Sequence, residues 1–532
     1  MKRLSYALSL LLCFSLLLSA CGTPASNVSS SGDDESKTLT MAIAAETTLL
    51  SPLYMGNSNF CTATMVYENL VNYVDGEIVP GLAERWEISD DGCTLTFYLH
   101  ENIKFHDGEP CDAEAIKANL EHKQSNPAFF TLKGVTDIES MEVINETTLA
   151  LHYSHPYFAY LNDFCWQDVM TIVSPNILIP GDFQTVKGVI GTGPYVYEEF
   201  VSGQYTRFVV NENYWGEIPY YDEIIVKYIP DSSSRIQALR TGEIDMIYGS
   251  ALLTYEEYQQ AMTIDGIEGM MAESDTRARD ITLNASSTIL SDLRVRQAIA
   301  YAINKTEISE GLTYGYEGVA NIPFTLDAPF SDVPLNNPIS HDLERANALL
   351  DEAGWIMNES TGIREKDGVP FSIVLTMDGG FDSLHNSLSA LLKSQLLAAG
   401  MDLSIKSQEQ MEWYADFVAG NFDITIWQPQ YAYASPHCWY TPMSAMTPQT
   451  PSLAAMSDSD EFFAAIDEFT MTDDTERLTE IFTYLLNYTL DNVIDIPLTY
   501  SKDMIVYNSD RIDGYTFRGV PCFFDVTQLI VK

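Results

Sequence analysis

Basic residues are scarce in this chain. Of its 532 residues, 28 are Lys or Arg and 75 are Asp or Glu, which gives a formal net charge of -47 at pH 7. Such a field repels nucleic acid phosphates and anionic lipid head groups, so nucleic acid binding is effectively excluded. A solvated surface accounts for the acidity better than an acidic ligand site does, although a cationic or metal-containing ligand would be attracted by the same field.

Catalytic signatures are also missing. The chain has no Gly-x-Ser-x-Gly elbow, no P-loop and no His-Glu-x-x-His motif. Gly191-Thr192-Gly193 is followed by proline instead of leading to a third glycine, so a dinucleotide fingerprint is absent. His100 and His106 lack helical metal-ligand spacing and are expected to be surface histidines. We therefore expect no enzymatic activity and no cofactor.

The first 21 residues have the pattern of an exported, lipid-anchored protein. Lys2 and Arg3 precede an apolar run over residues 6–18, which is too short to span a bilayer comfortably. The Leu-Ser-Ala-Cys string at 18–21 resembles the bacterial lipobox, which implies cleavage before Cys21 and acylation of that residue. Two or more acyl chains anchor a protein stably, whereas one binds marginally. The alternative is an ordinary secretory signal with an incidental cysteine.

The rest of the chain is expected to form two or more soluble lobes. Residues 22–37 are rich in Ser, Thr, Pro, Gly and Asp and predict a flexible stalk. The remainder is too long for one hydrophobic core, since single cores stop growing at roughly 250–300 residues. No later apolar stretch is long enough to cross a membrane.

Six of the eight cysteines would remain in the body of the mature protein, and none belongs to a CxxC pair. A structural zinc site or a thioredoxin-like motif is therefore not expected. Six cysteines are too sparse to form a disulfide framework, which leaves one or two incidental pairs or buried thiols. These residues are Cys61, Cys93, Cys111, Cys165, Cys438 and Cys522.

Local patterns change along the chain. Alternating apolar residues at 93–99 and 149–153 predict half-buried strands, and Asp112 precedes a capped helix over 113–121. From Asp231 onward, strands and helices alternate as far as a helix at 478–490. This alternation predicts an α/β lobe.

The composition of one segment predicts contact with a ligand. Residues 427–440 follow a predicted strand over 422–427 and hold five aromatic residues and a histidine among two prolines. Ligands of open α/β sheets bind beyond the carboxyl ends of strands, and aromatic walls bury much ligand surface. We interpret the segment as a pocket wall, and the alternative is that its aromatic residues fill space between helices.

Several strings resemble the family 5 solute-binding proteins, receptors of bacterial ABC importers for peptides and nickel complexes. They include MVYENL at 65–70, GTGPY at 191–195 and NENYWG at 211–216, and further strings lie at 81–86, 91–97, 103–110, 295–303 and 345–355. The resemblance implies an α/β, two-lobed periplasmic-binding-protein-like fold (type II, large cluster), with an extra subdomain in lobe one, a ligand cleft between the lobes and no catalytic activity.

The resemblance also implies a domain plan and partners. The partners are a small solute, an ABC permease and its ATPase, with the monomer tethered to the extracytoplasmic face of the cell membrane. Two other hypotheses are a lipid-anchored hydrolase of peptides or cell-wall fragments and a solute receptor without a transporter. The expected plan is a signal peptide at 1–20, a linker at 21–37, lobe one at 38–265 with its subdomain at about 66–180, lobe two at 266–495, and a return to lobe one at 496–532.

The ligand class stays open between a peptide and a nickel chelate. Residues 211–217 and 364–370 look closer to the nickel-binding branch, but Ala432 stands where peptide receptors carry an aspartate, and Met170 stands where nickel-chelate receptors carry an arginine. His437 is a candidate metal contact through a bound chelate, and Arg277 or Arg279 could clamp a carboxylate. The full set of expected contacts is Phe60, Phe129, Trp166, Arg277, Arg279, Trp427, Tyr431, Tyr433, His437 and Trp439.

Overall fold

The computed structural model describes residues 37–46, 60–126, 132–166, 170–183, 185–249, 252–380, 382, 384–428, 436–444, 447–518 and 524–532. The chain divides into two units, residues 1–37 and 38–532, and the described helices and strands lie in the second. None of the helices in these ranges is long and apolar enough to cross a membrane. Cys21 and the leader lie outside the described residues.

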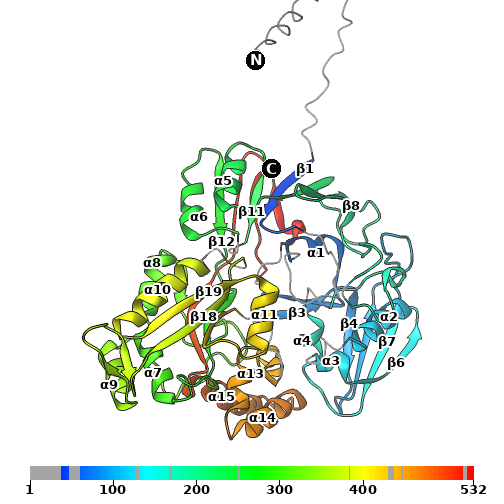
Figure 1. Ribbon diagram of the computed structural model, residues 1–532. Coiled ribbons are helices and arrows are strands. Elements are labelled where there is room, and N and C mark those ends of the chain that lie inside the picture. The colour runs from blue at the N-terminus through cyan, green and yellow to red at the C-terminus, as the bar shows by residue number, and fades with distance from the viewer. Residues whose placement is uncertain are drawn as a thin grey trace, which may run out of the picture. The chain divides into compact units, whose positions relative to one another are not determined.

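A seven-stranded sheet forms the core of the first lobe (Figure 1). Parallel pairing of β1 with β10 fixes its centre, and β22, from near the C-terminus, pairs with β11 and β12. The C-terminal part of the chain therefore returns to the first lobe. In sheet order the strands are β12 (Ile267–Met271), β22 (Met504–Asn508), β11 (Met246–Tyr248), β1 (Thr38–Ile43), β10 (Glu223–Tyr228), β9 (Tyr205–Val210) and β8 (Tyr195–Val201).

Helices cover this sheet. The Asp231 carboxylate accepts from the backbone N–H of Ser234 at 2.7 Å and so caps α5 (Ser232–Arg240). A capping box between Thr254 and Glu257 opens α6 (Tyr255–Ala261), and α1 (Phe60–Val66) packs near β8.

A subdomain inserted in the first lobe has its own four-stranded antiparallel sheet. Its strands are β4 (Ala83–Ile88), β5 (Thr94–Leu99), β7 (Thr148–Tyr153) and β6 (Ile138–Asn145). Alternate residues of β5 are buried, as the sequence pattern predicts, and Asp112 caps α2 (Ala113–Gln124). Two short helices, α3 (Lys133–Thr136) and α4 (Tyr160–Phe164), and the hairpin of β2 (Val71–Val74) and β3 (Glu77–Pro80) complete it.

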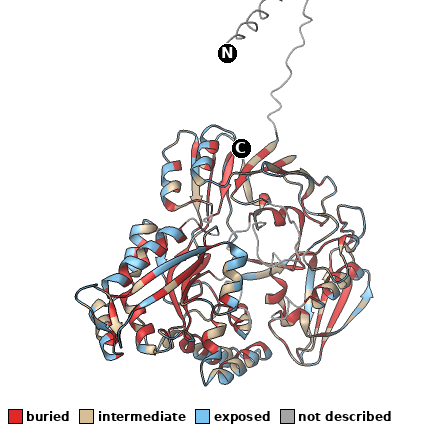
Figure 2. Ribbon diagram, viewed as in Figure 1, coloured by how far each residue is buried: buried red, intermediate tan, exposed pale blue. Residues whose placement is uncertain are grey.

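The second lobe is built on a six-stranded mixed sheet between two apolar cores (Figure 2). In order, its strands are β14 (Gly318–Val319), β21 (Asp495–Ser501), β13 (Arg277–Leu283), β20 (Ile424–Trp427), β18 (Ser372–Asp378) and β19 (Asp402–Gln408). One core contains α7 (Leu293–Ala302), α9 (Leu343–Glu352) and α10 (His385–Ala398). The other contains α12 (His437–Tyr440), α14 (Ser459–Met471) and α15 (Thr475–Asp491). The remaining helices include α8 (Lys305–Leu312), α11 (Gln410–Val418) and α13 (Thr450–Ala454).

Two neighbouring segments connect the lobes. The chain leaves the first sheet after Met271 and returns to it before Met504, a few residues beyond the expected boundaries at 265 and 495. The two segments bond to each other, with the Ala272 N–H donating to the Asp503 carbonyl at 2.9 Å. Two short paired connections between separately packed sheets have the geometry of a hinge.

Three of the strings that carry the family resemblance, at 65–70, 191–195 and 211–216, pack against one another in the first lobe. A Cβ on Gly191 would lie 2.0 Å from the Val66 carbonyl oxygen, so the GTGPY string fits only with glycine there. The Glu68 carboxylate accepts from the Tyr214 hydroxyl and from the Trp215 indole N–H, each at 2.8 Å. These strings therefore hold lobe one together, and their side chains are used in packing.

His106 belongs to the same contact region. A ring nitrogen of His106 lies 3.0 Å from the Gly193 carbonyl oxygen, and the residue is half-buried. The prediction of a surface histidine is wrong for His106, because the strand-to-loop stretch that carries it is covered by the GTGPY string.

Four described cysteines are free thiols, namely Cys93, Cys111, Cys165 and Cys438. The last three are buried, and burial raises the pKa of Cys111 and of Cys165. The prediction of buried thiols is confirmed for these three. The side chains of Cys61 and Cys522 lie outside the described residues.

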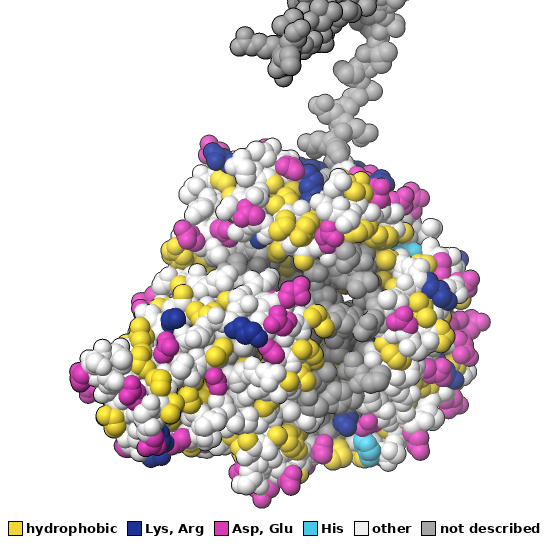
Figure 3. All heavy atoms as spheres, in the orientation of Figure 1, with side chains coloured by type: hydrophobic (Ala, Val, Ile, Leu, Met, Phe, Trp, Pro, Cys, Tyr) yellow, Lys and Arg dark blue, Asp and Glu magenta, His cyan; other side chains and the backbone are white. Residues whose placement is uncertain are grey.

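The surface carries the charge excess. Figure 3 shows Asp and Glu side chains scattered over the visible face, with fewer Lys and Arg among them. A dispersed distribution of this kind is typical of a solvated surface.

Candidate functional site

The subdomain and the second lobe meet at the short helix α12. His437 and Cys438 face the subdomain, where Cys438 belongs to the core that also contains Trp166. The next two residues, Trp439 and Tyr440, pack in the core of the second lobe. Consecutive side chains of one helical turn point in different directions, so α12 contacts both bodies at once.

A buried hydrogen-bonded pair crosses this junction. His437 Nε2 lies 3.0 Å from Asp163 Oδ1, and both side chains are buried, with 1% and 2% of their surface exposed. The second oxygen of Asp163 accepts from the Gly134 N–H and from the Tyr157 hydroxyl, each at 2.7 Å. Three donors therefore hold this carboxylate in place in the subdomain, and its partner comes from the other lobe.

Burial and neighbouring groups have opposite effects on the pKa of His437. Burial alone would lower its pKa, but Cys438 and the hydrogen bond to Asp163 outweigh burial and raise the pKa to about 10. The imidazole is therefore protonated at neutral pH when no metal is bound. The pKa of Tyr157 is raised by burial and by the adjacent Asp163 carboxylate, which keeps the hydroxyl a donor.

Asp163, His437 and Cys438 also form a possible metal-ligand group. One ligand atom from each lies within 4.8 Å of the others, and all three residues are buried. A thiolate, an imidazole and a carboxylate together suit borderline metals such as nickel, zinc or copper better than calcium or magnesium. A metal bound here would have to displace the proton from His437, which makes binding stronger as the pH rises.

Comparison with known proteins identifies the family. The sequence profile of the "Bacterial extracellular solute-binding proteins, family 5 Middle" matches residues 77–450. The chain belongs to the family 5 bacterial extracellular solute-binding proteins.

Relatives of this family 5 protein bind different solutes. The Escherichia coli "Nickel-binding periplasmic protein" is 30% identical over 469 residues, which cover 85% of this chain and 87% of that protein. A "Glutathione-binding protein GsiB" from Pectobacterium atrosepticum is 29% identical over 60% of this chain and 62% of its own length. The crystal structure of NikA from Brucella suis in complex with Fe(III)-EDTA superposes with a TM-score of 0.86 at 29% identity, covering 93% of this chain and all of that one. The two-lobed α/β fold expected from the sequence is thereby confirmed, and the family consists of solute-binding proteins rather than enzymes.

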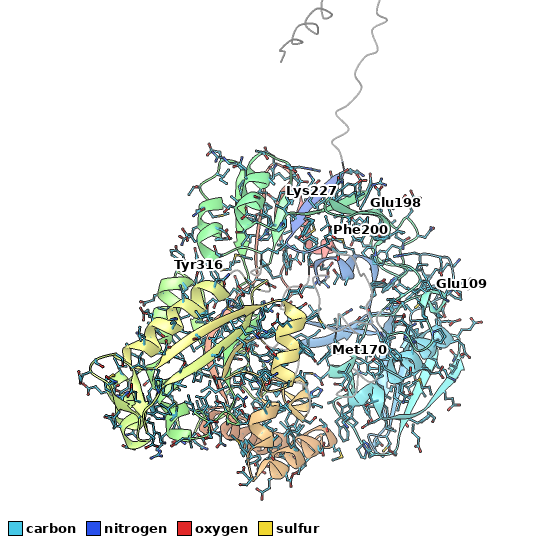
Figure 4. All side chains as sticks on the ribbon, in the orientation of Figure 1. Glu109, Met170, Glu198, Phe200, Lys227 and Tyr316 are labelled. Atoms are coloured by element: carbon cyan, nitrogen blue, oxygen red, sulfur yellow. The ribbon has the colours of Figure 1, made fainter. Side chains whose placement is uncertain are left out.

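The structure of the family 5 protein brings some of the predicted residues together. Trp166 and His437 lie at the junction, where the Trp166 indole N–H is 3.4 Å from Cys438 Sγ. Met170, labelled in Figure 4, is 1% exposed in the same subdomain core. At the end of β20, Trp427 packs against Trp413 and Phe417.

Other predicted residues lie elsewhere. Trp439 is 3% exposed and packs against Phe324 inside the second lobe. Arg277 is 3% exposed on β13. Phe129, Tyr431, Tyr433 and the side chain of Phe60 lie outside the described residues.

Arg279, expected as a possible carboxylate clamp, is already held by two carboxylates of the protein. Its guanidinium forms ion pairs with Glu317 at 3.0 Å and with Asp382 at 2.8 Å, and all three side chains are at most 2% exposed. The Tyr255 hydroxyl, from the first lobe, donates to Glu317 at 2.9 Å. This network gives Arg279 a structural role next to the connection between the lobes.

Sequence reasoning missed Asp163, Cys438 and Tyr157. Asp163 lies among aromatic residues in a stretch with no charged partner nearby in sequence, and this is the one signal that could have marked it. Its partner His437 is 274 residues away, so only the tertiary structure pairs them.

Proposed function

We propose that this protein is the substrate-binding lipoprotein of an ABC importer. It captures a small solute between its two lobes and delivers it to a membrane permease and its ATPase. The observation that supports this most is the buried junction at α12, where Asp163 and Trp166 from the first lobe meet His437 and Cys438 from the second. The lipid anchor would be Cys21, which places the protein on the extracytoplasmic face of the membrane.

A metal complex is the favoured solute class. The junction holds a thiol, an imidazole and a carboxylate, which suit borderline metals. One similar protein is named as nickel-binding, and another was crystallised with Fe(III)-EDTA. In this proposal His437 contacts the metal of a bound chelate, and Trp166 and Trp427 form walls of the site. A peptide is the second candidate, because DppA from Helicobacter pylori in complex with peptide STSA has the same fold at 21% identity and a TM-score of 0.78.

The hinge gives the proposed receptor its mechanism. A ligand stabilises the closed arrangement only to the extent that it contacts both lobes together. The α12 junction meets that requirement, since it joins groups of the subdomain to groups of the second lobe. Closure would bury the solute and create the surface that a permease recognises.

The first prediction concerns ligand contact. A nickel–histidine complex at a hundredfold excess over its Kd should stabilise the protein by about 2.7 kcal/mol. His437→Gln and Trp427→Ala should each lose most of this stabilisation, because each removes a proposed contact. The measurement is the ligand-induced change in melting temperature, taken for each variant from its own ligand-free value, with nickel, nickel plus L-histidine, Fe(III)-EDTA and di- to oligopeptides as probes.

His341→Ala is the matched control, because His341 is an exposed histidine whose ring contacts a backbone carbonyl. It should keep the wild-type shift. Wild-type shifts in both His437→Gln and Trp427→Ala would show that the segment is scaffold, and a response to peptides alone would move the ligand to the second candidate class.

The second prediction concerns the anchor. Cys21→Ala should abolish incorporation of labelled palmitate, because the acylated residue is gone. Cys93→Ala, which removes a thiol in the body of the protein, is the control. A Cys21→Ala variant that still incorporates palmitate would refute acylation at this residue.

A further inference from the structure

Two aspartates lie on one buried face of the second sheet. In the antiparallel pairing of β13 with β21, Thr282 is opposite Asp495 and Asp280 is opposite Pro497. Asp280 and Thr282 are two residues apart on β13, so their side chains point to the same side of the sheet. Asp495, opposite Thr282, points to that side too and is therefore a diagonal neighbour of Asp280. Both are buried, at 0% and 2% exposure.

The oxygens of this face have too few donors. Asp495 Oδ1 accepts from the Thr282 hydroxyl at 2.7 Å and from the Gln449 amide at 2.8 Å. Among the described residues, Asp495 Oδ2, both oxygens of Asp280 and Oε1 of the fully buried Gln449 have no hydrogen-bond partner. Four buried acceptor oxygens thus lie on or beside one face without a protein donor, which is costly unless another group satisfies them.

A pocket lies beside Asp495, which is the one residue among Asp280, Asp495 and Gln449 that lines it. It is lined by Asp495 of β21, by Asp491 and Asn487 of α15, and by Asn321, Asn337 and Lys305. The Lys305 ammonium donates to the Ala320 carbonyl at 2.9 Å, so this hydrogen bond goes to the backbone rather than to either aspartate. Burial lowers the pKa of Lys305 to about 8, and the nearby Asp280 offsets part of this effect, so the ammonium loses its charge as the pH rises above 8.

We propose that Asp280, Asp495 and Gln449 form a binding site for a hard cation of the calcium class, inside the second lobe and separate from the α12 junction. All four unsatisfied atoms are oxygens, which calcium prefers, and calcium accepts mixed carboxylate and amide ligands in a flexible geometry with water completing the shell. Magnesium demands a near-ideal octahedron and retains its waters, so it fits this set less well. Waters of the shell would enter from the pocket beside Asp495.

The experiment is a titration of the metal-depleted full mature chain with calcium chloride at pH 8, without any transport solute. The melting temperature should rise by about 5 °C at a hundredfold excess over Kd. Asp280→Asn should abolish the rise, because it removes an anionic ligand of the proposed site. Lys305→Met should tighten calcium binding about tenfold, since a nearby positive charge is removed.

A second readout locates the ion. Terbium should compete with calcium and emit sensitised luminescence on excitation of tryptophan, because Trp427 stands directly opposite Asp280 across β13 and β20. Trp427→Phe should lower this emission. Equal calcium shifts in wild type and Asp280→Asn would overturn the proposal. So would an absent calcium shift in wild type, since the unsatisfied oxygens would then not bind the cation. Neither outcome tests the importer function, since Asp280, Asp495 and Gln449 are not among its proposed solute contacts.

Discussion

Arg279→Met should lower the free energy of unfolding by about 3–5 kcal/mol. The substitution leaves Glu317 and Asp382 as buried carboxylates without their cation, and the guanidinium they lose lies within 3.0 Å of each. For a lobe of this size the melting temperature should fall by roughly 10 °C. Differential scanning calorimetry of the ligand-free protein at pH 7 measures the change.

Arg345→Met is the matched control, because Arg345 pairs with Glu352 at 3.8 Å with both side chains about half exposed. Exposed pairs contribute about 0–1 kcal/mol, so the control should melt close to wild type. The alternative from the sequence, in which Arg279 clamps a carboxylate of the ligand, predicts an unchanged ligand-free melting temperature. If Arg279→Met keeps the wild-type melting temperature but loses the ligand-induced shift, Arg279 is a ligand contact and the structural role is wrong.

The pair of His437 and Asp163 should make stability depend on pH in the alkaline range. The pKa of His437 is about 10 in the folded protein, against about 6.5 for an unperturbed histidine. Because the folded state binds this proton more tightly, the protonated His437 contributes its full stabilisation below pH 6.5. This stabilisation is lost as the pH rises through 10. Wild type should therefore exceed His437→Gln by about 3–5 kcal/mol at pH 6, and the gap should narrow toward pH 10.

Urea unfolding at pH 6, 8 and 10 measures this gap, and Cys438→Ala tests its cause. Cys438 is the group that raises the pKa of His437 most, so in Cys438→Ala the loss of stability should set in at lower pH. A gap between wild type and His437→Gln that stays constant from pH 6 to 10 would show that His437 does not titrate in this window.

These two networks have different consequences for the proposed receptor. The Arg279 network holds the second lobe near its connection to the first, and Tyr255 adds a contact from the first lobe. The His437 pair joins the subdomain to the second lobe directly, so a bound metal would compete with the proton that the pair shares. Loss of either network should lower stability, but the proposed ligand would act only on the second.

Much of the architecture was predictable because its signals are local. Alternation over a few residues predicts strand β5, and Asp112 marks the start of α2. The boundaries between the lobes were less accurate, since β12 and β21 gain their sheet membership from distant partners.

The family, the two-lobed class, the expected lipid anchor and the candidate segment around His437 follow from local patterns alone, because motifs, periodicity and capping depend on neighbours within a few residues. The roles of the charged side chains depend on the folded arrangement. Arg279 meets Glu317 and Asp382 from 38 and 103 residues away, and His437 meets Asp163 from 274 residues away. A buried charge is stable only beside its partner, and the fold, which brings distant segments together, chooses that partner.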